Sequence, residues 1–517
     1  MAEHIEYRPN ALLPKLGWFA RIDVPRGDVR VEHGAAVERN ERWMVEGVWD
    51  GPFAAGGFHE GGHLFGSGIR LENGRVHVVP SCALVDRLIY CRDGDDLLVS
   101  NSVPVLLAMT GARLDPRHDY RAEGRAIMGG LYKHDPTFRV RHPRIERFYQ
   151  LYYRSLIVGD GSVRMNLDRE PRQFASFADY RAALSQATGA IVANCRDAKR
   201  RAPLAEYGTL SDGYDSTTVC CLVKEHGVRN CFSYRGSWSG QCADCDTSPI
   251  AAALGLEPIW LSAASAHTSE DERYMHAASP AGFQLPLLQI ATHVERGGSA
   301  AVVFTGYHGD VIWDLRPGDS DHAADTLRHD LSGLDLSEVR LKAGFVHVAV
   351  PFLFARSTPS IRAISRSAEM KPWRLNNDYD RPICRRIVES EGVARHLFGV
   401  KKHGLLGSTR RPVDARLRER YLRYLDEAYG MGRAWVYTRF ALDRLTGLGL
   451  QRTARALPAR GPLAELRNRL YARFWRLMDG ESLFPGRVNF RVALYAWSVE
   501  ELKREMTGAN SGARLEH

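Results

Sequence analysis

Short apolar runs alternate with helical patterns in the middle of the 517-residue chain, and this alternation restricts the fold more than any other feature. Short buried strands that are each followed by a helix are typical of a parallel sheet. We therefore expect an α/β unit with a doubly wound parallel sheet. The expected segments, in chain order, are a helix at 180–195, a strand at 207–210, a helix at 216–226, a strand at 231–234, a helix at 248–254 and a strand at 258–261.

The two flanking regions have different patterns. Residues 1–165 contain short strand-like runs among Gly and Asp turns, which predicts a β-rich sandwich. A polar, non-periodic linker is expected at 164–177, before an α/β domain at 178–410. Residues 411–514 are expected to be helical, with an apolar stripe that docks on the α/β domain and arginines that face outward. The stripe consists of Leu463, Leu466, Leu470, Phe474 and Leu477.

The formal net charge of +9 comes almost entirely from residues 411–517, which contain 20 Lys or Arg against 12 Asp or Glu. A nucleic-acid partner is a natural first interpretation of such a charge. However, the segment has no basic stretch interleaved with aromatic residues, so we consider nucleic acid an unlikely partner. The arginines are interpreted as solvated surface or as a cradle for an acidic or peptide substrate.

Other global features concern location. The first residues have no basic and apolar leader pattern, and no run of about 18 apolar residues exists, so neither a signal peptide nor a membrane span is expected. Nine cysteines, including the adjacent pair Cys220 and Cys221, fit reduced thiols better than a disulfide framework. We therefore expect a cytoplasmic protein with no membrane association.

The strongest local motif lies at 207–218, where a short apolar strand ends in a loop of small residues and a helix follows directly. Such a loop directs backbone N–H groups and a helix N-terminus at one point, which favours phosphate binding. An acidic side chain within it can hold Mg²⁺ against the same phosphates. The alternative interpretation is an ordinary βα turn with good capping residues. The candidate nucleotide-binding residues here are Ser211, Asp212, Gly213, Asp215 and Ser216.

Residues 211–216 resemble the pyrophosphate-binding loop S-G-G-x-D-S of the asparagine synthetase and β-lactam synthetase family. Further segments are similar to family segments in the same order, over roughly residues 178–410. These are the start of a helix at 246–251, a glycine-rich acidic turn at 304–310, a Pro-Phe-Leu segment at 350–353 and a lysine loop at 399–404.

The resemblance implies a reaction in which a substrate carboxylate attacks the α-phosphate of ATP, pyrophosphate leaves, and an amine captures the acyl-adenylate to give an amide and AMP. It implies that Asp215 and Asp310 hold Mg²⁺ ions, which suits their hard carboxylate oxygens. Gly306 and Gly309 belong to the glycine-rich turn of the nucleotide site. Lys402 matches the lysine that stabilises charge on the α-phosphate and the leaving group, and its neighbour Lys401 remains an alternative.

Tyr307 is similar to the tyrosine of β-lactam synthetase-like members, where it works with a glutamate to deprotonate the attacking amine. The matching glutamate position here is His347, and a histidine can perform the same proton transfer near neutral pH. A half-buried strand histidine without a catalytic role is an equally weighted interpretation. Phe354 also replaces the family's aspartate after Pro-Phe-Leu.

Two departures limit the resemblance. Asp212 replaces the first glycine of the loop and adds a negative charge beside a triphosphate. The N-terminal region resembles the family's glutaminase domain only in outline, because Ala2 stands where the family has its cysteine nucleophile. The resemblance therefore implies a glutamine-independent ligase or cyclase, similar to β-lactam synthetases and lasso-peptide cyclases. Its substrate would be a small molecule or peptide with a carboxylate and an amine, in natural-product biosynthesis, with a partner protein as a further expectation.

Two alternatives stay open. Cys242 and Cys245 form a C-x-x-C that would suit a tRNA sulfurtransferase with a similar phosphate loop, although two ordinary thiols are favoured. A non-catalytic family member is the other alternative, with Asp212 as its sign. The pattern H-E-x-x-H, from His59 to His63, is rejected as a zinc protease because its glycine-rich surroundings do not favour a helix.

Overall fold

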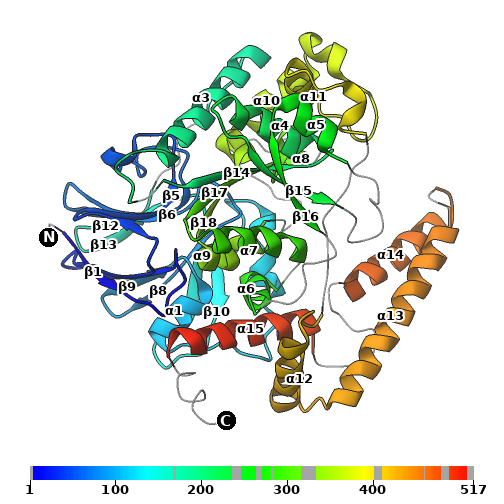
Figure 1. The fold of residues 1–517 in the computed structure, drawn as a ribbon. Helices are drawn as coiled ribbons and strands as arrows, with labels where there is room; N and C mark the ends of the chain where they lie inside the picture. Colours follow the sequence, from blue (N-terminus) through cyan, green and yellow to red (C-terminus); the bar gives the residue numbers. More distant parts are fainter. Residues whose placement is uncertain are drawn as a thin grey trace.

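The computed structural model contains a β-rich N-terminal region, an α/β unit and a C-terminal helical region (Figure 1). The expected mixed α/β class is therefore confirmed, at the level of these three regions. Structural statements refer to the described residues, which are 4–166, 171–201, 203–235, 246–262, 270–280, 284–315, 333–400, 410–458, 460–478 and 488–508.

The N-terminal region is built from two sheets, as the alternation of short strands and turns predicts. In sheet order the first contains β1 (Ile5–Pro9), β3 (Val29–His33), β2 (Trp18–Asp23), β9 (Asp96–Ser100), β8 (Leu88–Asp93), β11 (Arg147–Leu151) and β10 (Thr137–Arg139). The second contains β13 (Ser162–Met165), β12 (Leu156–Gly159), β7 (Arg75–Val79), β6 (Phe65–Glu72), β5 (Trp43–Val48) and β4 (Glu38–Arg39). The short helices α1 (Val103–Thr110) and α2 (Arg121–Arg125) follow β9.

Both sheets contribute side chains to one apolar core, in which Trp18 and Val99 of the first sheet share a cluster with Ile69 and Val78 of the second. The outer face of the second sheet is covered by the loop at 49–64, which we call the covering loop. A separate apolar cluster holds this loop on β5 and on the end of β7. It consists of Trp43, Val45, Trp49, Phe53, Phe58, Leu64 and Val79.

The central sheet is entirely parallel, as the alternation of strands and helices predicts. Its strand order is β16 (Glu257–Ser262), β15 (Asn230–Arg235), β14 (Ala205–Leu210), β17 (Ala301–Thr305) and β18 (Phe345–Ala349). From β14 the chain adds strands outward to β15 and β16, and then returns to the other side of β14 with β17 and β18. The strand order therefore reverses between β14 and β17.

Helices cover both faces of this sheet (Figure 1). One face carries α3 (Phe177–Cys195), α4 (Tyr214–Lys224), α5 (Ser248–Leu254), α8 (Gly309–Ile312), α10 (Thr358–Arg366) and α11 (Pro382–Ser390). The other carries α6 (Glu272–Ala278), α7 (Leu288–Gly297) and α9 (Leu336–Ala343). The side chains of β17 alternate accordingly, since Val302 and Phe304 join one core and Ala301 and Val303 join the other.

Buried charges connect the β-rich region to the α/β unit. Arg340 of α9 pairs with Glu46 of β5 at 2.7 Å and with Asp86 at 2.7 Å, and all three residues are almost fully buried. On the same helix, Glu338 accepts hydrogen bonds from the Ser102 hydroxyl at 2.7 Å and from the Val103 backbone N–H at 3.0 Å. It thereby satisfies the first N–H group of α1, that of Val103, from a distant part of the chain.

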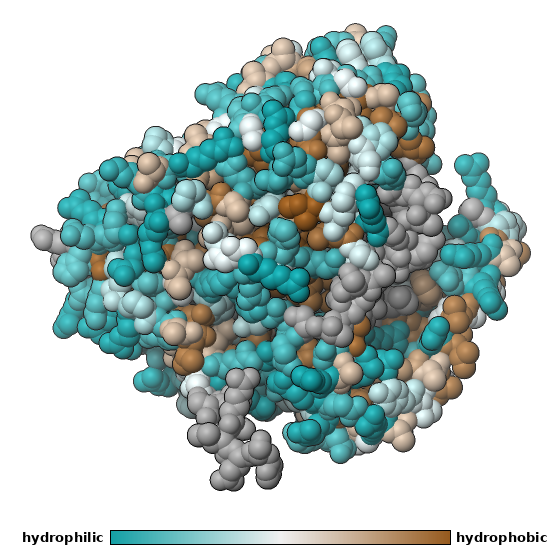
Figure 2. Space-filling model, viewed as in Figure 1, coloured by the Kyte–Doolittle hydropathy of each residue, from teal (hydrophilic) through white to brown (hydrophobic). Residues whose placement is uncertain are grey.

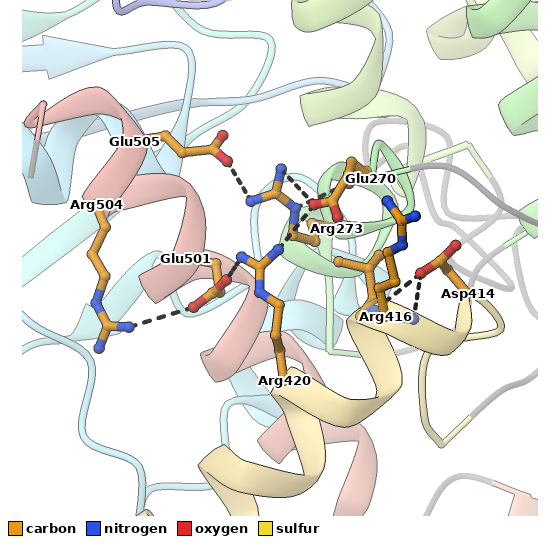
Figure 3. A network of polar contacts seen from close by, with 9 residues as sticks. Glu270, Arg273, Asp414, Arg416, Arg420, Glu501, Arg504 and Glu505 are labelled. Atoms are coloured by element: carbon orange, nitrogen blue, oxygen red, sulfur yellow. Dashed lines mark hydrogen bonds and ion pairs between the residues drawn. The ribbon is translucent and has the colours of Figure 1, made fainter. Parts of the chain in front are cut away.

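The C-terminal region is helical, with α12 (Ala415–Tyr429), α13 (Arg433–Ala456), α14 (Ala464–Met478) and α15 (Phe490–Met506). Within the described residues, no helix is both long enough and apolar enough to cross a membrane. The final helix, α15, packs against α1 and α6. Ion pairs connect these helices. Arg273 of α6 pairs with Glu505 of α15 at 2.5 Å, and Arg420 of α12 pairs both with Glu501 of α15 and with Glu270 (Figure 3).

The expected docking of the 463–477 stripe on the α/β unit is wrong. The stripe packs against α13 to form a helical hairpin, and Leu463 and Leu466 remain 47% and 48% exposed. Figure 2 shows hydrophobic residues along the outer edge of α13 as well. The expectation that the arginines face outward is also only partly correct, since Arg439 and Arg491 are buried.

Candidate functional site

The candidate site lies at the carboxyl ends of β14 and β17, where the strand order of the parallel sheet reverses. Open α/β sheets bind ligands at such a point, outside the carboxyl ends of the strands. The sequence-predicted residues 211–216 follow β14, and residues 306–310 follow β17. Two predicted segments that are about 90 residues apart in the sequence are therefore brought together.

The loop after β14 is held by its own small polar residues. The hydroxyls of Ser211 and Ser216 are 2.5 Å apart, and the Gly213 N–H donates to the Ser211 hydroxyl at 3.1 Å. The Thr217 hydroxyl donates to the carbonyls of Ser211 and Gly213. Gly213 is the N-cap of α4 and supplies no side-chain cap, and the first N–H of the helix, that of Tyr214, donates to the Tyr379 hydroxyl at 3.4 Å. This arrangement is suited to an external anion.

The turn after β17 packs directly against this loop. A Cβ atom on Gly306 would lie 2.6 Å from the Asp215 Cβ, and one on Gly309 would lie 2.5 Å from the Asp215 Oδ1. His308 between them has a φ of 74°, a left-handed conformation that is uncommon for a residue with a side chain. Its ring stacks on Phe352 at 4.4 Å. Asp310 follows in the first turn of α8, so both predicted Mg²⁺ ligands lie at this junction.

Sequence reasoning missed Arg381, which forms an ion pair with the Oδ1 of Asp215. The Arg381 side chain is 1% exposed, and its guanidinium lies over the ring of Tyr379 at 5.1 Å. Burial by itself would lower the pKa of Arg381, but Asp215 and Tyr379 raise it by more, so the arginine keeps its charge. Nothing in the spacing of the sequence links residue 381 to residue 215.

Tyr307 and His347 are brought together, as the resemblance implies. Their rings are in edge contact with centroids 5.3 Å apart. His347 is 1% exposed in the middle of β18, and its Nε2 lies 2.7 Å from the Thr305 hydroxyl. The Tyr307 hydroxyl donates to the side-chain carbonyl of Gln284. Tyr307 is only partly buried and is therefore the more accessible member of this pair.

Lys401 and Lys402 lie outside the described residues, as do Cys242 and Cys245. The chain that leads to the lysines does contact the site, because the Gly399 N–H donates to the Asp212 carbonyl at 2.7 Å. Gly399 has a φ of 64°, and a Cβ atom there would lie 2.3 Å from the Tyr214 ring, so this close approach requires glycine. Three residues of extended chain span at most about 11 Å, which bounds the distance from Gly399 to Lys402.

The residues present fit a nucleotide and Mg²⁺ in their donor chemistry. Asp215 and Asp310 offer hard carboxylate oxygens near the N-terminus of α4, whose N-cap glycine supplies no side-chain cap. Comparisons with protein-family models and with curated proteins give no match.

Proposed function

We propose that this chain is an ATP- and Mg²⁺-dependent ligase or cyclase of the asparagine synthetase and β-lactam synthetase type, which forms an amide bond without glutamine. The observation that carries the proposal is the packing of Gly306 and Gly309 against Asp215 at the point where the strand order reverses. Two separately predicted motifs meet there in a geometry that suits a polyphosphate and its metal.

The residues of the loop have distinct roles in this proposal. Ser211, Gly213 and Ser216 bind the leaving pyrophosphate with hydroxyl and N–H groups, and the N-terminus of α4 favours its negative charge. Asp215 and Asp310 hold Mg²⁺, which neutralises charge on the phosphates. Lys402 reaches the α-phosphate from the segment that begins at Gly399.

The contact between Tyr307 and His347 supports a base for the attacking amine. In the proposal Tyr307 acts as a phenolate that takes the amine proton and becomes the phenol, and His347 holds the tyrosine ring through their edge contact. His347 is too deeply buried to meet a substrate directly, which favours a positioning role over that of the base itself. The amine and the carboxylate come from one small molecule or peptide, or from two, in a lactam- or macrolactam-forming pathway.

The direct test is exchange of labelled pyrophosphate into ATP in the presence of candidate carboxylates, together with detection of AMP. A carboxylate-dependent exchange that requires Mg²⁺ would support the proposal. Binding of MgATP without exchange or AMP formation on any carboxylate, across amino acids and peptides, would contradict it. The Asp310→Asn variant serves as the matched loss-of-function control.

Lys402→Ala tests the role of the lysine. Because Lys402 is assigned to the charge that develops during the reaction, its loss should lower turnover by about 100-fold or more while leaving MgATP affinity within a few-fold. Lys401→Ala is the matched neighbour and should retain most activity. Normal turnover in Lys402→Ala with loss in Lys401→Ala would transfer the role to the neighbour.

One observation favours a second candidate, a non-catalytic binding protein. Arg381 supplies Asp215 with a protein cation where a Mg²⁺ ion is proposed. Calorimetry with MgATP separates the two candidates, because a non-catalytic chain with a closed Asp215–Arg381 pair should bind no MgATP. Affinity in the micromolar range in the unmodified protein would remove this candidate.

A further inference from the structure

The covering loop brings together side chains that the proposed ligase does not use. His59 and Glu60 of this loop lie over the outer face of the second sheet, next to Glu72 at the end of β6. One ligand atom from each of these three residues lies within 4.8 Å of the other two. The His59 Nε2 is 2.5 Å from the Glu72 Oε2, and the His59 side chain is only 4% exposed.

His77 of β7 adds a second imidazole to this group. Its ring centroid is 4.8 Å from that of His59. A second imidazole therefore lies beside the three-residue group, between the covering loop and the β6–β7 hairpin.

Hydrogen bonds from a neighbouring arginine orient one of these donors and hold the covering loop beside it. The Glu72 Oε1 accepts a hydrogen bond from Arg70 at 3.1 Å, which leaves the Oε2 directed at His59. Arg70 also donates to the backbone carbonyls of Ala55 and Gly56, so it fixes the covering loop at the same point. Such outer hydrogen bonds orient ligating carboxylates in metal sites.

His59 also has a buried polar atom that the hydrogen bond to Glu72 does not use. Within the described part of the chain, the Nδ1 of His59 is buried and has no hydrogen-bond partner. His59 also lines a cavity of about 560 Å³.

We propose that His59, Glu60 and Glu72 bind one divalent transition-metal ion, with Zn²⁺ as the best fit, and that this ion fastens the covering loop to the β6–β7 hairpin. Imidazole and carboxylate ligands suit Zn²⁺ in tetrahedral geometry. Two atoms that each lie about 2.0–2.2 Å from one ion are at most about 4.4 Å apart, so only a small movement is needed. The exposed Glu60 side chain can supply it.

The site differs from the protease motif that the sequence contains. His63, the second histidine of H-E-x-x-H, directs its Nδ1 to Asp50 at 2.6 Å and takes no part in the cluster. His59 and Glu60 instead use ligands from the adjacent hairpin, in a loop of turns rather than on a helix. The proposed role is structural, and no hydrolytic step is assigned to it.

The test is Zn²⁺ binding to the purified full chain after chelator treatment, measured by equilibrium dialysis. We expect one tight equivalent, and a loss of affinity of about 100-fold or more in His59→Asn and in Glu72→Gln. His63→Asn is the matched histidine control and should bind as the unmodified protein does. Asp310→Asn should also bind normally, which separates this site from the proposed Mg²⁺ site.

Absence of tight Zn²⁺ binding in the unmodified chain would overturn the proposal, as would normal binding in Glu72→Gln. If His59→Asn fails to fold, Co²⁺ bound to the unmodified chain gives a second readout. Tetrahedral nitrogen and oxygen ligands should give visible d–d bands without a thiolate charge-transfer band. A strong thiolate band would assign the metal to cysteines and contradict the proposal.

Discussion

At the residue scale, Asp215 is the side chain around which the candidate site is arranged. Gly306 and Gly309, in the turn after β17, lie against Asp215, and Arg381 forms an ion pair with it. The side chain is 25% exposed, so it remains accessible from the strand ends. Its position therefore depends on two glycines that leave space and on one arginine that supplies charge.

Gly309→Ala should disturb this arrangement. The added methyl group would lie 2.5 Å from the Asp215 Oδ1 and 2.9 Å from its Cβ, so Asp215 must move. We expect a destabilisation of roughly 1–3 kcal/mol and at least a tenfold loss of MgATP affinity, measured by chemical denaturation and calorimetry. Gly432→Ala, at a position with no atom within 4 Å and a φ of −57°, is the control and should leave MgATP affinity unchanged. Unchanged affinity in Gly309→Ala would contradict this account of the site.

The ion pair between Asp215 and Arg381 predicts strong coupling between these two positions. Arg381→Met leaves the Asp215 carboxylate without its buried partner. The substitution should therefore cost more stability in the unmodified protein than in the Asp215→Asn background. A double-mutant cycle by urea denaturation should give a coupling of about 1–3 kcal/mol. Additive effects of the two substitutions would show that the pair contributes nothing to the folded state.

Local sequence reasoning predicted a loop at 211–216 between a strand and a helix, and the structure has this loop between β14 and α4. Its phosphate-binding role stays a prediction. Sequence reasoning had no means of finding Arg381, whose partner lies on another loop. The packing of Gly309 on Asp215 could not be predicted from the sequence either, because the neighbours of a glycine depend on the order of the strands in the sheet. The positions of Lys402, Cys242 and Cys245 stay predictions.

At the element scale, α9 holds α1 in place through one carboxylate. Glu338 accepts hydrogen bonds from Ser102 and Val103, and it is buried completely. Burial raises the pKa of Glu338 from 4.5 to about 7, although its hydrogen bonds and nearby arginines act in the opposite direction. The folded protein therefore holds a proton here that the unfolded chain releases at lower pH.

This shift predicts a specific pH dependence of stability. Between pH 4.5 and about 7 the folded state binds more protons at Glu338 than the unfolded state does, so this contribution is complete at low pH and is lost as the pH rises. The total contribution is up to about 3 kcal/mol. In Glu338→Gln the free energy of unfolding should fall less between pH 5 and pH 7.5. Parallel pH profiles for the two proteins, from urea denaturation, would exclude the effect.

The elements themselves were largely predictable from the sequence, whereas their partners were not. The alternation that predicted the parallel sheet is a local property of each segment and is confirmed. The stripe at 463–477 does form a helix, but an amphipathic face does not specify what covers it. The structure pairs it with α13, because that helix is its neighbour in the chain.

At the scale of the whole molecule, the β-rich region and the α/β unit share buried polar contacts. Arg340 joins Glu46 and Asp86 across this boundary, and Asn194 of α3 donates to the Gly51 carbonyl at 2.7 Å. Burial raises the pKa of Glu46, and Arg340 counteracts it. Charges of this kind require their partners, so the two regions should unfold together.

Arg340→Met should therefore destabilise both regions at once. It leaves two buried carboxylates without a cation, and we expect a loss of about 3–5 kcal/mol. Arg30→Met removes a guanidinium that is 71% exposed in a surface pair with Glu6 and should cost less than about 1 kcal/mol. Differential scanning calorimetry and urea denaturation of the two variants provide the measurement. A separate unfolding transition for the β-rich region would contradict this prediction.

The position of α15 has a consequence for the order in which the molecule is made. Lys503 of this helix donates to the Ala112 carbonyl at 2.7 Å, across 391 positions of the sequence. During synthesis α1 leaves the ribosome long before α15, so one side of its apolar surface stays uncovered while most of the chain is translated. Until α15 emerges, that apolar surface is exposed on the nascent chain, and exposed surface of this kind makes incompletely folded chains prone to aggregation.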